Sequence, residues 1–217
     1  MKRQPDLLVP AEGIWTADPW PAGWTPEGVI ETLEPLALDD RRARFWAVAR
    51  GRIGSVTVLM DAPHDPHNAA AVLRSCDGFG IPRVHLVPRE EDFAVGRTVA
   101  KGAERWIEVV PHRTPEIALS ALHEQGFTTV ATHPEGNLAP DDLAKLPRVA
   151  LILGNEHDGI RDALHQGAKE SVRIPMRGFV ESFNVSVAAA VLLYAATRGR
   201  EGDLPEAEQL RFYARAL

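Results

Sequence analysis

The sequence predicts an α/β protein, in which a parallel β-sheet carries helices on both faces. From residue 55 onward, short apolar runs alternate with amphipathic segments, and several amphipathic segments end near a glycine. Strands that alternate with helices need crossover connections, which make the sheet parallel and cover both of its faces. The 217 residues are 45% hydrophobic, enough to fill one sizeable core. We therefore expect one main domain with appendages at its ends.

Residues 1–38 are predicted to form an irregular N-terminal arm. Residues 1–37 hold six of the 17 prolines and three of the five tryptophans, which are Trp15, Trp20 and Trp24. Proline removes backbone donors and fixes φ, which disfavours regular elements, while indole rings favour burial against a surface. The arm is expected to pack on its own domain or on a partner subunit, and a dedicated recognition arm is the alternative.

Residues 39–54 are predicted to contain a basic helix. Either Asp39 or Asp40 can cap its N-terminus. The twelve residues from 41 to 52 contain no acid and five arginines, namely Arg41, Arg42, Arg44, Arg50 and Arg52.

The main domain is assigned to residues 55–200, and a final helix to residues 201–217. Five strands are expected, at residues 56–61, 83–88, 127–134, 148–156 and 174–176. Four helices are expected among them, at residues 68–80, 114–126, 161–170 and 182–198. The final helix carries an apolar stripe at helical spacing that needs a packing partner, made of Ala207, Leu210, Tyr213 and Leu217.

Composition limits the location and the partners of the protein. The single cysteine, Cys76, excludes an intrachain disulfide and suits a reducing compartment. The N-terminus lacks the apolar stretch of a signal peptide, and the chain has no membrane-spanning apolar run, so a cytoplasmic protein without membrane contact is expected. The net charge of −6 gives no global attraction to phosphates. Any binding of nucleic acid must therefore depend on local basic patches.

The segment after the first strand is one candidate site, because ligands of open parallel sheets bind beyond the carboxyl ends of strands. Asn68 is expected to cap the helix that follows, and Arg74 comes six residues later. Six residues correspond to about 600° of helical rotation, so only a non-helical Asn68 at the cap would let both side chains point into one pocket. A simple cap and a solvent-facing arginine are the alternative.

A second candidate is the stretch LILGNEHDGI, where a strand runs into a loop. Gly154 ends the strand, Glu156 follows, and Gly159 allows the backbone to approach a ligand closely. The alternative is a strand-to-helix turn in which Glu156 lies near a helix N-terminus, where negative charge is favourable.

A third candidate is IPMRGFVESFNVSVAAAVLLY, where a polar loop separates an apolar run from a helix of small residues. Ser182 or Asn184 can cap this helix, but capping does not account for the whole loop. Alanine and valine in the helix allow very close packing against a neighbour.

Other familiar motifs are absent from the sequence. His64 and His67 have no carboxylate or cysteine at ligand spacing, so no metal site is expected. The chain also lacks a G-x-G-x-x-G dinucleotide fingerprint, a G-x-S-x-G motif, a P-loop and a C-x-x-C pair.

Taken in order, NAAAVLRSCDGFG, LILGNEHDGI and IPMRGFVESFNVSVAAAVLLY resemble the three motifs of the SpoU/TrmH branch of the SPOUT superfamily of RNA 2′-O-methyltransferases. The resemblance covers about residues 55 to 198. It implies a Rossmann-like sheet with a deep C-terminal trefoil knot, S-adenosylmethionine bound in the knot, and a homodimer with sites near the subunit interface.

The resemblance also implies roles for individual residues. The cofactor would lie against Leu153, Gly154, Ile174, Met176, Phe183 and Asn184. The catalytic residues would be Arg74, Asn68, Ser182, Asn184 and Glu156. Arginine is effectively never deprotonated, so Arg74 is expected to hold a substrate phosphate and to stabilise the developing alkoxide.

Within the family, the chain resembles most the enzymes that modify the D-loop guanosine of tRNA, at position 18. RNA contacts are expected from Arg41, Arg42, Arg44 and Arg105, if the helix at 39–52 lies over the carboxyl end of the sheet. A 23S ribosomal RNA methyltransferase and a non-catalytic RNA- or cofactor-binding protein are the alternatives. A nucleotide-dependent oxidoreductase also fits an α/β pattern, but the missing glycine fingerprint disfavours it.

Overall fold

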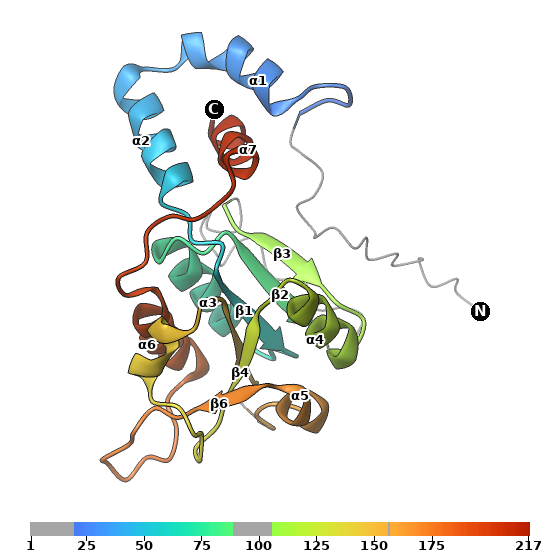
Figure 1. The fold of residues 1–217 in the computed structure, drawn as a ribbon, viewed down its shortest axis with the longest axis vertical. Coiled ribbons are helices and arrows are strands. Elements are labelled where there is room, and N and C mark those ends of the chain that lie inside the picture. The colour runs from blue at the N-terminus through green and yellow to red at the C-terminus, as the bar shows by residue number, and fades with distance from the viewer. Residues whose placement is uncertain (1–19, 89–105, 156) are drawn as a thin grey trace, which may run out of the picture.

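The computed structural model describes residues 20–88, 106–155 and 157–217, and it shows an α/β fold around a six-stranded parallel sheet (Figure 1). The strand order across the sheet is β3-β2-β1-β5-β4-β6. The strands are β1 (Val56–Asp61), β2 (Arg83–Val87), β3 (Glu108–Pro111), β4 (Thr128–Thr132), β5 (Val149–Leu153) and β6 (Glu170–Val172). The predicted class is confirmed.

Helices connect the strands and extend beyond them. The α-helices are α1 (Pro26–Leu33), α2 (Asp39–Arg50), α3 (Pro66–Gly78), α4 (Pro115–Glu124), α5 (Asp162–Gly167), α6 (Val185–Thr197) and α7 (Glu206–Ala216). Two 3₁₀ segments, η1 (Glu34–Leu36) and η3 (Pro140–Lys145), complete the described elements. Within the described ranges, no helix has the length and apolarity needed to cross a bilayer.

The order of the strands reverses between β1 and β5. The chain moves outward from β1 to β2 and β3, and then β5 returns to pair with β1, with Met60 opposite Leu153. In open parallel sheets, ligands bind at such a switch point, beyond the carboxyl ends of the two central strands. The loops after β1 and β5 therefore meet where a site is expected.

Alternate residues of the strands fill two separate cores. Val58 and Met60 of β1 belong to a cluster on the face covered by α3, α6 and η3, with Leu73 and Leu193 among its buried members. Leu59 points to the opposite face, where α4 and α5 cover a smaller cluster. This two-residue alternation is what a strand buried on both faces requires.

The amino end of the sheet is covered by a layer of three helices, α1, α2 and α7 (Figure 1). Tyr213 of α7 is fully buried, and its ring stacks on Trp46 of α2 with centroids 4.1 Å apart. The Tyr213 hydroxyl donates to Glu34 Oε1 at 2.5 Å. Burial and this hydrogen bond raise the pKa of Tyr213 to about 12. The final helix thus finds its packing partner in α2.

Three predictions about helical segments are wrong. Residues 26–33 form a helix in the arm that was expected to be irregular, because Thr25 caps it and Pro26 occupies the first turn, where proline is tolerated. Asp65, not Asn68, caps α3, with its Oδ1 accepting from the His67 N–H at 2.8 Å. Leu38 occupies the N-cap position of α2 without a side-chain hydrogen bond, so Asp39 and Asp40 lie in its first turn.

The strand pattern also differs from the prediction at two edges. The segment 174–176 is not a strand, and the last strand instead lies at 170–172, beginning at the final residue of the predicted helix 161–170. That helix ends at Gly167, which lets the chain extend and pair with β4. The strand at 108–111 was not predicted, since its four residues give too little periodicity.

The basic helix lies at the opposite end of the sheet from the one expected. α2 leads through a short connection into Val56, the first residue of β1, and so lies at the amino end. Its arginines therefore do not lie over the carboxyl end within this chain.

Candidate active site

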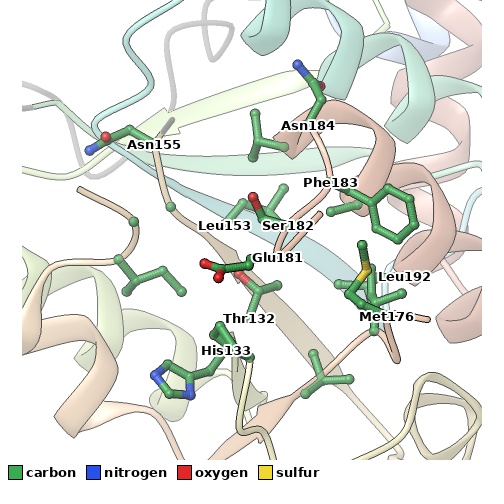
Figure 2. A pocket seen from close by; sticks show the side chains of 18 residues that line it. Thr132, His133, Leu153, Asn155, Met176, Glu181, Ser182, Phe183, Asn184 and Leu192 are labelled. Atoms are coloured by element: carbon green, nitrogen blue, oxygen red, sulfur yellow. The ribbon is translucent and has the colours of Figure 1, made fainter. Parts of the chain in front are cut away.

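A cavity of about 530 Å³ lies beyond the carboxyl ends of β4, β5 and β6 (Figure 2). Its floor is apolar and its rim is polar. It is lined by Thr132, His133, Pro134, Leu153, Gly154, Asn155, Gly159, Ile160, Val172, Ile174, Met176, Glu181, Ser182, Phe183, Asn184, Val185, Ala188 and Leu192. A size of about 300–1,000 Å³ and a mixed lining are typical of pockets for small molecules and cofactors.

The loop after β5 closes on itself at the edge of this cavity. The backbone amides of His157 and Asp158 each donate to Asn155 Oδ1 at 2.9 Å, and Asn155 and Gly159 bond to each other through their backbones. Gly159 has a φ of +70°, which favours glycine, and a Cβ on Gly154 would lie 2.3 Å from the Gly159 carbonyl carbon. The loop thus requires glycine at both positions.

A buried ion pair anchors the same loop to the centre of the sheet. Asp61, at the end of β1, is fully buried, and Arg161 follows the loop. The Arg161 backbone N–H donates to Asp61 Oδ2 at 2.7 Å, and its Nε donates to Asp61 Oδ1 at 2.5 Å. Arg161 Nη2 also donates to the Val87 carbonyl at 3.2 Å. The Asp61–Arg161 pair therefore ties the loop after β5 to the end of β1 through the carboxylate and to the end of β2 through the guanidinium.

The polar loop before α6 is held by Asn184. Its Oδ1 accepts from the backbone N–H of Ser186 at 2.9 Å, which caps α6 as predicted, and from Ser186 Oγ at 2.6 Å. Its Nδ2 donates to Asn68 Oδ1 at 3.0 Å. One amide therefore connects the start of α6 to α3, and Figure 2 shows Phe183 and Asn184 on this loop beside Ser182 and Glu181.

Asn68 and Arg74 lie on different parts of α3. Asn68 is in the first turn, where it lines a small recess beside Leu153 and Gly154. Arg74 is exposed and lies about 9 Å further along the helix axis. It does not belong to the described lining of the large cavity. Because Asn68 is helical, the geometric condition for a shared pocket is not met within one chain.

Two predicted residues lie outside the described part of the chain, namely Glu156 and Arg105. Other residues of the cavity were missed, among them Thr132 and His133 at the end of β4, and Asn155. The available signal was their position after predicted strands, where polar side chains reach the ligand side of a sheet. Glu181 also lines the cavity, and the sequence predicts no specific role for it.

The described residues contain no group of three or more metal-binding side chains. Cys76 is fully buried, and burial raises the pKa of its thiol, which keeps it protonated and unreactive. Two histidine rings pack at the cavity edge, His133 against His165, with centroids 4.7 Å apart. The site thus consists of a cavity, amide groups and backbone loops.

The fold and this site define the class of protein, since the chain belongs to the SpoU rRNA Methylase family, whose sequence model matches residues 55–194. Among its relatives is the tRNA (guanosine(18)-2′-O)-methyltransferase of Escherichia coli strain K12. The two chains are 35% identical over 181 residues, which is 79% of each.

Solved structures share the fold. The TrmH/SpoU tRNA modifying enzyme of A. aeolicus matches with a TM-score of 0.72 and 26% identity, over 81% of this chain and 95% of that one. The AdoMet-bound rRNA methyltransferase of Sinorhizobium meliloti matches with a TM-score of 0.60 and 27% identity, over 70% of this chain and 59% of that one.

Proposed function

We propose that this protein methylates a ribose 2′-hydroxyl of RNA with S-adenosylmethionine, and that its substrate is guanosine 18 in the D-loop of tRNA. The observation that carries the proposal is the cavity beyond the carboxyl ends of β4, β5 and β6, which is lined by the second and third sequence motifs, together with the adjoining small recess, which is lined by residues of all three. The 35% identity to a tRNA enzyme over most of both chains favours tRNA. The reaction is expected to take place in the cytoplasm, where its RNA substrates are.

The cavity fits the proposed cofactor in size and in chemistry. Apolar side chains suit an adenine ring and a methylene chain, while backbone and hydroxyl groups suit ribose and carboxylate. The residues proposed to hold it are Leu153, Gly154, Ile174, Met176, Phe183 and Asn184. A deep trefoil knot, in which the segment 173–184 folds beside the loop after β5, is part of the proposal.

When bound, S-adenosylmethionine supplies an electrophilic methyl group. The residues of this chain would orient the RNA and stabilise charge, because a ribose hydroxyl is a poor nucleophile at neutral pH. Asn68, held by Asn184, would orient the ribose, and Ser182 would complete the loop around the acceptor. Arg74 would hold an RNA phosphate from outside the cavity and stabilise the developing alkoxide. Glu156 would keep the two loops together.

A homodimer with sites near its interface is also proposed. The loop before α6 and the exposed side of α6 carry a continuous series of exposed apolar side chains, which are Phe179, Val180, Phe183, Val187, Val191 and Tyr194. Large exposed apolar patches mark interaction surfaces. RNA contacts are proposed for Arg41, Arg42, Arg44 and Arg105.

The test is transfer of labelled methyl groups from S-adenosylmethionine to purified tRNA and, separately, to ribosomal RNA, followed by mass spectrometry of nuclease fragments. We expect 2′-O-methylguanosine at position 18 of tRNA. Methylation of 23S ribosomal RNA alone would show that the proposed substrate is wrong and the proposed reaction is right. The likeness to an rRNA methyltransferase supports this alternative. Transfer to neither RNA would refute the proposed activity.

A further inference from the structure

A second pocket, of about 210 Å³, lies at the amino end of the sheet, between α2, α7 and the end of α3. It is lined by Arg44, Phe45, Val48, Ala49, Arg52, Asp77, Trp106, Phe212 and Ala216. β1 runs for six residues between this end and the candidate active site, which separates the two by about 20 Å in one chain. The pocket is therefore distinct from the cofactor cavity.

Aromatic rings and arginines dominate this lining. Phe45 on α2, Phe212 on α7 and Trp106 before β3 bring three rings to one hollow. Aromatic side chains can stack on unpaired bases without regard to sequence, and nearby arginines can add contacts to the RNA backbone.

Arg52 gives the pocket a polar anchor. Its side chain is 2% exposed, Nη2 pairs with Asp77 Oδ1 at 2.7 Å, and its guanidinium lies 5.6 Å from the ring centre of Phe212. Among the described residues, no acceptor is within hydrogen-bonding range of the buried Arg52 Nε. Buried donors of this kind are normally satisfied, so an acceptor from a ligand would complete the site.

The surface around the pocket attracts phosphates. Arg41, Arg44 and Arg50 are exposed on α2, and no acid follows Asp40 in that helix. Arg41 also packs over the Phe45 ring at 5.1 Å, which combines a cation with an aromatic face at one position. A charged ridge beside an aromatic hollow is complementary to a nucleotide, whose phosphate is anionic and whose base is planar.

We propose that this pocket binds one unpaired base of the RNA substrate, at a point remote from the nucleotide that is methylated. The inference rests on the proposed function, since it assumes an RNA substrate. It gives the arginines of α2 a role that fits their position at the amino end. RNA is then held at two points, the reactive ribose at the cavity and a splayed base at the pocket.

The test compares matched variants. Arg44→Gln and Arg50→Gln each remove one positive charge from the same helix, but only Arg44 lines the pocket. Phe45→Leu removes a stacking ring and keeps an apolar side chain. We expect Phe45→Leu to weaken tRNA binding about fivefold to tenfold, and Arg44→Gln to weaken it more than Arg50→Gln. Affinity for S-adenosylmethionine should stay unchanged, the Michaelis constant for tRNA should rise with the loss of tRNA affinity, and thermal melting will verify folding.

A measurement on the unaltered protein complements the variants. tRNA transcripts that lack natural modifications, and in which uridine is replaced by 4-thiouridine, are irradiated in the presence of the full-length protein. The crosslinked peptides are then sequenced. Crosslinks on the peptides that contain Phe45, Trp106 or Phe212 are expected. Absence of such crosslinks, or unchanged tRNA affinity in Phe45→Leu, would refute the pocket even if position 18 is methylated. Failure of methyl transfer with crosslinks present would refute the proposed reaction instead.

Discussion

The two ends of the sheet are each organised by one charged side chain, and the two differ in what they hold. At the carboxyl end, the Asp61 carboxylate accepts from the backbone and side chain of Arg161 and so positions a loop at the cavity. At the amino end, Arg200 donates to the carbonyl groups of Leu146, Pro147 and Ala196, at 2.5, 2.9 and 2.7 Å.

The difference shows how stability and function are divided in this fold. Arg200 satisfies carbonyl groups at the ends of helical segments and before β5, and helices cover the rest of that end. Asp61 instead holds a loop that remains open toward solvent on its other side. Loss of the Arg200 contacts should therefore lower stability and leave cofactor binding intact, whereas loss of the Asp61 contacts should lower stability and weaken cofactor binding together.

The largest effect is expected where the carboxyl end meets the RNA. Arg74→Ala should lower kcat for methyl transfer by about 100-fold or more, because a charge-stabilising group is lost from the transition state. Calorimetry should show S-adenosylmethionine affinity within a few-fold of the wild type, since Arg74 does not line the cavity. Near wild-type turnover by the alanine variant would disprove the role proposed for Arg74.

The second prediction breaks the anchor of the loop. Asp61→Asn should lower the free energy of unfolding by about 3 kcal/mol, because Arg161 loses its buried anionic partner. S-adenosylmethionine should also bind more weakly, because Gly159 and Ile160 line the cavity just before Arg161. Urea denaturation and calorimetry measure the two quantities. A loss of stability with unchanged cofactor affinity would contradict the positioning role of Asp61.

The third prediction supplies the matched disruption at the amino end. Arg200→Met should lower the free energy of unfolding by about 2 kcal/mol, since several carbonyl groups lose their donor and only part of that loss is recovered by water. Cofactor affinity should not change. If Arg200→Met weakened cofactor binding as much as Asp61→Asn does, the proposed division between the two ends would be wrong.

The prediction with the smallest effect near neutral pH concerns a buried histidine pair that lies apart from both charged centres. His85 Nδ1 and His112 Nε2 are 2.8 Å apart. Burial lowers the pKa of both rings, that of His85 to about 3, with smaller contributions from His112 and Arg83. The unfolded chain therefore binds more protons than the folded one between about pH 3 and pH 6.5.

The free energy of unfolding should consequently fall as the pH falls below 6.5, by about 1 kcal/mol per pH unit for one such ring. Urea denaturation at several pH values measures this slope. His85→Leu should flatten it, and an equal slope in the variant would assign the acid sensitivity to other groups.

Local patterns in the sequence were sufficient for β1, α2 and the capping of α6. β1 is a run of five apolar or small residues followed by Asp61, and Asn184 stands directly before the long Ala- and Leu-rich segment of α6. Such signals depend on neighbours within a few residues. The three motifs that indicated the candidate site are also contiguous stretches of sequence, so each could be recognised from neighbouring residues alone.

Contacts between distant parts of the chain could not be predicted from such local patterns. Asp61 and Arg161 are 100 residues apart, and Asn68 and Asn184 are 116 apart. No periodicity records such pairs, because they depend on the order of strands in the sheet. The short strand β6 also depends on a long-range contact, since its three residues form a strand only when β4 lies beside them.

The shared amide of Asn184 has a consequence for the order in which ligands bind. Its Oδ1 holds the start of α6 beside the cofactor cavity, while its Nδ2 holds Asn68 on the helix that carries Arg74. A ligand that orders Asn184 therefore also orders Asn68 for the second ligand, and by linkage the gain in affinity that one ligand gives the other is returned by the same factor. S-adenosylmethionine and RNA should thus bind cooperatively, and after each turnover the departure of either product should speed the release of the other.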